Sequence, residues 1–392
     1  MTDRAVDGGT APTAAARRRV RRRIGGSARG RIGGSAPGER GRSDRHPGRS
    51  FRYPGRSARH PARSSPHPGR SARHPGRFSV HRGRFSWHRG RVLAALAVLT
   101  AALLVFHRAV PGTPGRLGSL LETFLPWLGL AVPVLLGLAL LRRSAIALPA
   151  LLLPAAAWTH LFAGLLLPAA PPGPRDLTVV QHNVADDNPD PAGTARDLAA
   201  AGPDLIALQE LVPPALAVYE RTLSADYPYH AVRGTVGLWS KHPLTEAVAL
   251  DIRPEGIEGE WSRGLRTLVA TPRGEIAAYV AHLPSVRLGA GGLASGRRDA
   301  SAALLGEALA AEGQTRVILL GDLNGTVDDR GLAPLTSQLN TAERGVAFSF
   351  PAGFPLARID QVMARAATVT QVRTLPATGS DHLPVAARIT LP

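Results

Sequence analysis

The sequence predicts an α+β fold in which a domain of two packed sheets, covered by helices, follows a basic tail and several apolar helices. Three observations support this prediction. Strand-like stretches predominate after residue 175 and often follow one another in pairs, three uncharged apolar runs lie between residues 92 and 167, and the first 91 residues contain few aliphatic side chains. Strands in consecutive pairs favour two packed sheets and argue against a parallel α/β barrel.

Residues 1–91 form an Arg/Pro/Gly-rich tract in which a seven-residue unit recurs from Pro47, beginning PGRSFRY, PGRSARH and PARSSPH. Pro and Gly in the early units exclude a coiled coil. Because so few apolar residues cannot offset the entropy lost on ordering, we predict a disordered tail. Two interpretations stay open: an arm that binds anionic lipid headgroups or nucleic acid, and a drifting low-complexity repeat without a role, which is favoured.

The apolar runs predict three transmembrane helices at about 92–110, 124–141 and 145–167. Three such runs with short connectors favour a membrane over a buried core helix or a cleaved signal peptide. The basic tail and the Arg142–Arg143 pair are predicted to be cytoplasmic, because positive residues stay on that side. Three crossings then predict a multi-pass protein of the cell membrane whose C-terminal domain is extracytoplasmic.

Residues 168–174, PAAPPGP, predict a short stiff linker, and residues 175–392 predict the folded domain. The strand-like stretches are 177–183, 205–209, 235–241, 265–272, 275–283, 316–324, 359–364, 367–375 and 385–391. The helix-like stretches are 192–201, 213–224 and 293–312.

Charge and cysteine content exclude some classes of function. The chain has no cysteine, so disulfides and thiol chemistry are excluded. The net charge of +18 belongs to the tail, which has 24 arginines and four acidic residues, whereas residues 176–392 have 18 basic and 24 acidic residues. A nuclease needs a basic track along its polyanion, so this domain gives little sign of a nucleic-acid partner, although a local patch stays open.

Several predicted strands end in polar side chains that a structural strand does not need. They are Asn183, Gln209, Glu210, His282, Asp322 and Asn324, and three further polar residues lie at or just before the start of a strand: Asp360, Asp381 and His382. Each alone has an ordinary interpretation as a turn residue, a solvated strand end or a hydrogen-bonded core histidine. Together they supply carboxylates and amides that suit a hard cation and histidines that can donate to a phosphate. This combination predicts metal-assisted phosphoester hydrolysis.

The motifs LQE, HL, GDLN, ID and SDH, in this order, resemble those of the endonuclease/exonuclease/phosphatase family. That family includes deoxyribonucleases, abasic-site endonucleases, neutral sphingomyelinases and inositol-polyphosphate phosphatases. The resemblance covers most of residues 176–392 and implies a four-layer α/β-sandwich, with two packed mixed sheets flanked by helices. The layout of three spans before this domain, with LGSLLETFLPWLGL and HNVADDNPDPAGTARDLAA, also resembles the VanJ-type teicoplanin-resistance membrane proteins of actinomycetes.

The resemblance implies a metal site for Mg²⁺, with Mn²⁺ as the alternative ion. Glu210 would ligate the ion, with Asn183 close by and Asp381 sharing the site. Some members of the family also place a tyrosine near the phosphate, and Tyr227 and Tyr229 are the candidates here.

The resemblance also implies catalytic roles. Asp322 would align and deprotonate the attacking water, and Asn324 would hold that water or the phosphate. His382 would contact the scissile phosphate, with Asp360 fixing its tautomer and favouring its charged form. His282 would stabilise the phosphate from the other side.

The predicted membrane anchor favours a lipid substrate, because a domain tethered by a short spacer meets lipid phosphates at high effective concentration. We expect a Mg²⁺-dependent phosphoesterase acting on a lipid phosphate or pyrophosphate ester. The second resemblance implies an undecaprenyl pyrophosphate-like carrier and a role in glycopeptide (teicoplanin) resistance. Two alternatives stay open: a membrane-tethered Mg²⁺-dependent nuclease, and an inactive ligand-binding or scaffold protein. The intact metal and histidine set counts against the latter.

Overall fold

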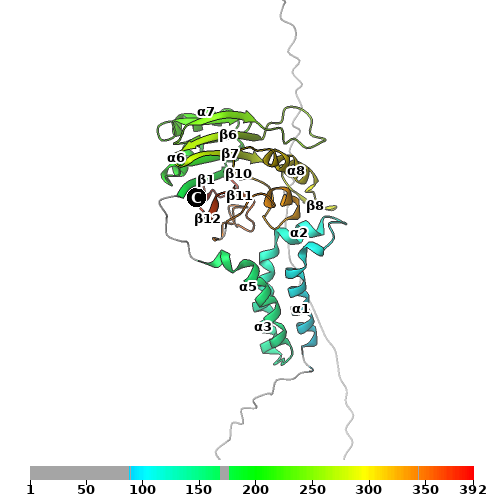
Figure 1. The fold of residues 1–392 in the computed structure, drawn as a ribbon. Helices are drawn as coiled ribbons and strands as arrows, with labels where there is room; N and C mark the ends of the chain where they lie inside the picture. Colours follow the sequence, from blue (N-terminus) through cyan, green and yellow to red (C-terminus); the bar gives the residue numbers. More distant parts are fainter. Residues whose placement is uncertain (1–87, 89, 168–175, 343) are drawn as a thin grey trace, which may run out of the picture. The chain divides into compact units, whose positions relative to one another are not determined.

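The structure is a computed structural model that describes residues 88, 90–167, 176–342 and 344–392 (Figure 1). Of the predicted disordered tail, only residues 88, 90 and 91 lie within these ranges. The predicted linker at 168–174 lies outside the described residues.

The first sheet has six strands. Its order is β12 (Thr368–Thr374), β13 (Val385–Thr390), β1 (Asp176–Asn183), β2 (Leu205–Gln209), β4 (Val236–Ser240) and β3 (Tyr229–Arg233). Strand β1 runs parallel to β2 and antiparallel to β13, so the sheet is mixed. Its register pairs Asn183 with Gln209 at the end of both strands.

The second sheet has five strands and is also mixed. Its order is β11 (Asp360–Arg365), β10 (Val317–Asp322), β7 (Gly274–His282), β6 (Gly264–Thr271) and β5 (Leu244–Ala249). Strand β10 is parallel to β7 and antiparallel to β11. The register sets Asp322 opposite His282 on one side and opposite Asp360 on the other.

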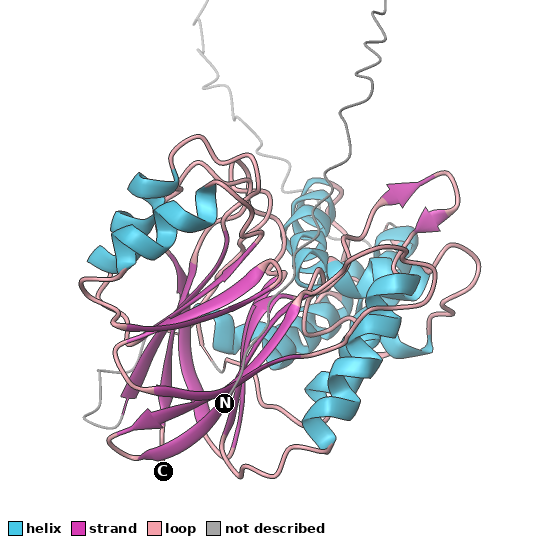
Figure 2. Cartoon of the chain, turned by 90° about the horizontal axis from the view of Figure 1, so that it is seen from above, coloured by secondary structure: helices cyan, strands magenta, loops and turns pink. Residues whose placement is uncertain are grey.

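Successive side chains along each strand point to opposite faces of its sheet, and this produces the layers. Val179 of β1 and Leu320 of β10 belong to the core between the two sheets, whereas Val180 and Leu319, the next residue and the preceding one, pack against helices on the outer faces. Helices α6 (Pro191–Ala200) and α7 (Ala215–Leu223) cover the first sheet, and α8 (Gly296–Ala310) with η3 (Arg330–Leu332) and α9 (Ala333–Thr336) covers the second (Figure 2). Two mixed sheets flanked by helices confirm the predicted sandwich.

Sequence reasoning missed the short or exposed strands. Strands β3 and β5 were not predicted, nor was the small hairpin of β8 (Leu288–Gly289) and β9 (Gly292–Leu293). Strands β3 and β5 form sheet edges and expose much of their surface, so they carry no apolar run. The hairpin also takes Leu293, the first residue of the stretch predicted as helix 293–312, and α8 starts at Gly296.

The apolar region forms short helices with breaks between them. They are α1 (Arg91–Val105), η1 (His107–Ala109), α2 (Leu117–Thr123), η2 (Leu125–Leu130), α3 (Ala131–Leu141), α4 (Ala147–Ala150) and α5 (Leu152–Leu166). In the described part of the chain, the helical stretch Ala147–Leu166 is long and apolar enough to cross a membrane. The pair Leu117–Thr123 and Leu125–Leu141, bent by 69°, would add a second span if counted as one.

The first predicted span differs from the structure at its C-terminal end. Helix α1 stops at Val105, because Phe106 leaves the helical region at φ −109° and ψ 24°. Beyond it the chain continues as the short helix η1, and the apolar helix α1 itself has 15 residues. A threefold crossing of the membrane stays a prediction.

An ion pair joins helix α2 to the domain of sheets. The side chain of Glu122 is fully buried and accepts hydrogen bonds from Arg330 Nε at 2.9 Å, Nη2 at 2.8 Å and the backbone N–H at 2.9 Å. The same guanidinium donates to the backbone oxygens of His107 and Val110. A bidentate pair of this kind fixes both position and orientation. Trp127 of η2 adds a hydrogen bond to the Leu356 carbonyl at 2.7 Å.

We predict that Glu122→Ala destabilises the chain by about 3 kcal/mol, because it leaves the Arg330 guanidinium without its carboxylate partner at the junction. Thermal unfolding of the detergent-solubilised full chain measures this. Glu246→Ala is the matched control, since that mostly exposed carboxylate also pairs with an arginine, Arg266 at 2.7 Å, and we expect a loss of less than about 1 kcal/mol. Equal losses in the two variants would contradict the structural role of Glu122.

Candidate active site

The polar strand ends converge at one edge of the two sheets. Strands β1, β7 and β10 end in Asn183, His282 and Asp322, and β11 begins at Asp360. Side chains from both sheets meet here: Asn183 Nδ2 of the first sheet donates to Asp322 Oδ2 of the second at 3.1 Å. Residues distant in sequence therefore form one constellation.

Asn183 also links this edge to Glu210. Its Nδ2 donates to Glu210 Oε1 at 3.1 Å, and the Asp186 N–H donates to Oε2 at 3.2 Å. Glu210 adopts a left-handed backbone with φ 62°. Such a conformation is costly for a residue with a Cβ atom and is concentrated at functional sites, where the surrounding structure holds it.

Asp322 is buried and held by Asn324. The Asn324 N–H donates to Asp322 Oδ1 at 2.9 Å, and its Nδ2 donates to Oδ2 at 3.2 Å and to the Leu283 carbonyl at 2.9 Å. Asn324 has φ 47°, a second left-handed residue at this edge. Burial and then the negative charge of Asp360 raise the pKa of Asp322. A carboxylate with a raised pKa is a stronger base, which suits proton abstraction from water.

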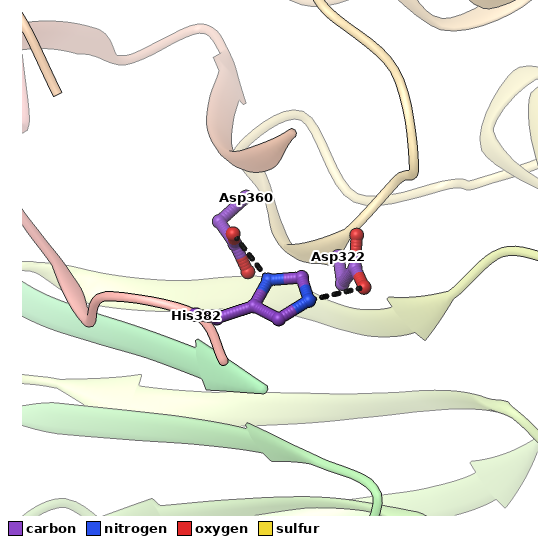
Figure 3. Close-up of side chains that lie close together, drawn as sticks. All are labelled: Asp322, Asp360 and His382. Atoms are coloured by element: carbon purple, nitrogen blue, oxygen red, sulfur yellow. Dashed lines mark hydrogen bonds and ion pairs between the residues drawn. The ribbon is translucent and has the colours of Figure 1, made fainter. Parts of the chain in front are cut away.

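His382 forms a buried pair with Asp360. Its Nδ1 lies 2.8 Å from Asp360 Oδ2, and its Nε2 lies 3.8 Å from Asp322 Oδ2 (Figure 3). Gln181 Nε2 donates to the other Asp360 oxygen at 3.0 Å. Burial opposes the charged imidazolium, but the Asp360 carboxylate outweighs it and raises the pKa of His382 to about 10. At neutral pH His382 is therefore a cation with Nε2–H directed toward Asp322.

His282 is buried on the other side of Asp322. Its Nε2 lies 3.6 Å from Asp322 Oδ2 and 3.8 Å from Glu210 Oε1, and it has no hydrogen-bond partner among the described residues. Arg263 Nη1 lies 3.5 Å from Nδ1. Burial, followed by the charges of Arg263 and His382, lowers the pKa of His282 to about 3, so the ring is neutral. Because arginine can only donate, Nδ1 is the acceptor and the proton lies on Nε2.

The unpartnered Nε2 of His282 shows that this site fits a further group. A buried donor without a partner is costly, and Nε2 faces two carboxylates at distances too long for hydrogen bonds. Asp322, Asp360 and His382 also place potential metal-ligand atoms within 4.8 Å of one another. Since Asp360 already pairs with Nδ1 of the histidine, and Mg²⁺ prefers oxygen ligands, Glu210 beside Asn183 is the better cation site.

The eight predicted site residues all lie at this edge, but they differ in whether they line its cleft. A cleft of about 540 Å³ is lined by six of them: Asn183, Glu210, Asp322, Asn324, Asp381 and His382. His282 and Asp360 lie behind it, buried. The Asp381 carboxylate is 67% exposed, with Oδ1 4.0 Å from His382 Nε2, so it lies at the rim.

The tyrosine candidates are wrong. Tyr227 is buried and donates its hydroxyl to the Pro203 carbonyl at 3.0 Å, and neither Tyr227 nor Tyr229 lines the cleft. Two site residues were missed. Gln181 lies two residues before Asn183, so the period of a strand could have placed it on the same face. Arg263, in WSRGL, follows no pattern that would have identified it.

Comparison with known proteins gives a family and weak structural matches. The sequence profile of the Endonuclease/Exonuclease/phosphatase family matches residues 180–382. No curated protein matches the chain. Among solved structures, an endonuclease/exonuclease/phosphatase family protein from Bacteroides thetaiotaomicron is 16% identical over 56% of this chain and 100% of its own, with a TM-score of 0.46. A beta toxin mutant from Staphylococcus aureus with bound magnesium ions is 13% identical over 54% and 99%, with a TM-score of 0.44.

A third match is the endonuclease/exonuclease/phosphatase from Beutenbergia cavernae, which is 20% identical over 55% of this chain and 72% of its own, with a TM-score of 0.43. These identities and TM-scores are low, and the match to the sequence profile shows the family. The profile covers just over half of the chain, and its range includes all eight predicted site residues. The chain therefore belongs to the endonuclease/exonuclease/phosphatase family, whose members are hydrolases of phosphoric esters that use a divalent metal ion.

Proposed function

We propose that this protein is a membrane-anchored, extracytoplasmic Mg²⁺-dependent phosphoesterase that hydrolyses a lipid phosphate or pyrophosphate ester. An undecaprenyl pyrophosphate-like carrier is the proposed substrate, and release of that carrier for reuse is the proposed route to glycopeptide (teicoplanin) resistance. The resemblance to VanJ-type membrane proteins supports this choice of substrate. The structural observation that supports a lipid is the attachment of apolar helices to the catalytic domain through the ion pair of the buried Glu122 carboxylate with Arg330.

The surface of those helices favours a bilayer. Nineteen of the 24 large hydrophobic side chains that are exposed in the described ranges lie between Val92 and Leu167. Val92, Leu141 and Leu152 are 72%, 81% and 69% exposed. An apolar surface this extensive is unfavourable in water and is typical of a membrane or an interaction site.

The charge distribution supports a topology. Arg91 begins α1, and the Arg142–Arg143 pair follows α3. The start of α1 and the end of α3 lie at the end of the helices that is remote from the sheets (Figure 1). With the positive end in the cytoplasm, the catalytic domain that follows α5 is extracytoplasmic.

In the proposed mechanism, Glu210 would hold the divalent cation, with Asn183 beside it and Asp381 at the rim of the same cleft. The bound ion would neutralise charge on the phosphate and on the leaving group. Mg²⁺ and Mn²⁺ both prefer oxygen ligands, so the carboxylates of this cleft suit either ion.

The remaining residues act on the water and the phosphate. Asp322 accepts the proton of the attacking water, and Asn324 keeps the Asp322 carboxylate in one orientation. His382, charged through its pairing with Asp360, donates Nε2–H to a phosphate oxygen. His282, neutral, donates Nε2–H from the opposite side of Asp322. Two preorganised donors that face developing negative charge lower the barrier, because they need no reorganisation during the reaction.

A panel of substrates tests the proposal against a nuclease and against an inactive binding protein. We expect the purified full chain to release phosphate from undecaprenyl pyrophosphate with Mg²⁺, to stop when EDTA removes the ion, and to slow by about 10²- to 10⁴-fold in Asp322→Ala. Plasmid nicking that Asp322→Ala abolishes, without release from lipid, would overturn the lipid substrate. Binding without turnover of any substrate would favour the scaffold.

We further predict that Asp360→Asn lowers kcat by about 10²- to 10⁴-fold, because His382 loses the partner that fixes its tautomer and charge. His382 is charged below its pKa, so the wild type keeps the cation up to about pH 10, whereas in the variant the Asp360 charge no longer offsets burial and the pKa of His382 falls. The pH profile of the variant should therefore fall at lower pH. Asp226→Asn, at an exposed acid, is the control, and an unchanged profile in Asp360→Asn would refute this role.

Topology is tested by protease treatment of intact cells. We expect the catalytic domain to be cleaved from outside and an epitope at the N-terminus to be protected until the membrane is permeabilised. The reverse pattern of protection would invert the proposed orientation.

A further inference from the structure

The active-site cleft has a polar end and an apolar wall. The polar end carries the site residues described above, whereas the wall includes Leu120, Phe124, Leu288, Leu293, Phe350 and Leu356. The two regions meet at His382, since the ring of Phe350 lies 4.9 Å from the His382 ring. An apolar surface therefore begins next to the group that faces the phosphate.

Part of this wall comes from the apolar helices. Leu120 belongs to α2, and Phe124 is its C-cap residue. Phe124 is 40% exposed and Leu288 in the β8–β9 hairpin is 68% exposed, so the wall presents free apolar surface. Exposed aromatic and aliphatic side chains beside a polar site are typical of a ligand groove.

Hydrogen bonds between the helical region and the domain of sheets fix each segment of the wall. Glu122 holds α2 through Arg330, as described above. The Leu293 N–H donates to the Gly115 carbonyl at 2.9 Å, and Trp127 Nε1 donates to the Leu356 carbonyl at 2.7 Å. The wall is thus preformed by helix and domain together, which lowers the entropic cost of binding.

We propose that this wall binds the first part of the hydrocarbon chain of a lipid phosphate, while the phosphate lies at the polar end. The inference rests on the proposed function and extends it by naming a subsite and its residues. The wall is continuous with the phosphate site on one side and with the apolar helices on the other, as a substrate entering from the bilayer requires. Arg287 is the single basic side chain among the lining residues other than His382, so the wall does not suit a polynucleotide backbone.

The test compares isoprenyl pyrophosphates of increasing chain length with a soluble phosphodiester that has no chain. In the wild type we expect kcat/KM to rise with chain length until the wall is covered. Phe124→Ser should lower kcat/KM for the long-chain substrates by about 10- to 100-fold and leave the soluble phosphodiester unchanged, because one apolar anchor is lost and the polar end is intact. Phe354→Ser is the matched control, since that phenylalanine is 71% exposed and does not line the cleft.

The outcomes separate the subsite from the function on which it rests. Chain-length dependence that Phe124→Ser reduces and Phe354→Ser leaves intact supports the subsite. Hydrolysis of lipid pyrophosphates that ignores both chain length and Phe124→Ser would overturn the subsite and leave the proposed function standing. Absence of lipid hydrolysis, with DNA cleavage in its place, would overturn both. Binding of a non-hydrolysable alkylphosphonate, measured by calorimetry on wild type and both variants, gives the same comparison without turnover. Residual binding by a variant would also show that it is folded.

Discussion

The site depends on the contact between strand β1 of one sheet and strands β10 and β11 of the other. Two side-chain amides of β1 cross the gap: Asn183 reaches Asp322, and Gln181 reaches Asp360. Because side chains alternate along a strand, a slip of one residue in β10 would turn Asp322 toward the helices and replace it with a glycine. The apolar core between the sheets therefore sets the position of every polar group at their edge.

Those polar groups have different chemistry because their surroundings differ. Two histidines flank the same carboxylate, yet one is a cation and the other is neutral. His382 has a carboxylate directly behind it, which offsets the cost of burial, whereas His282 has a guanidinium near its ring, which adds to that cost. Both present Nε2–H toward Asp322, so the neighbourhood supplies one charged donor and one neutral donor from the same residue type.

The sequence was most informative where a strand ended in a polar residue. Asn183, Asp322 and Asp360 could be placed together because such ends meet at a sheet edge, and the motifs around them identified the family. Contacts between distant segments that carry no motif could not be predicted. Glu122 and Arg330 are 208 residues apart and lie in segments whose local patterns say nothing of pairing. Prolines in the apolar runs, such as Pro126 and Pro149, indicated kinks, whereas hydropathy measures composition and gives no backbone angles.

The shared wall of the cleft has a consequence for work with fragments. A soluble piece beginning near residue 175 would contain the sheets and every polar group of the site, and it would still lack Leu120 and Phe124. It would also expose the Arg330 guanidinium, which the full chain covers with a carboxylate and two carbonyls. The rate at which such a piece hydrolyses small esters would report on the polar groups of the site. Its preference among larger substrates would differ from that of the full chain, because one side of the cleft is missing.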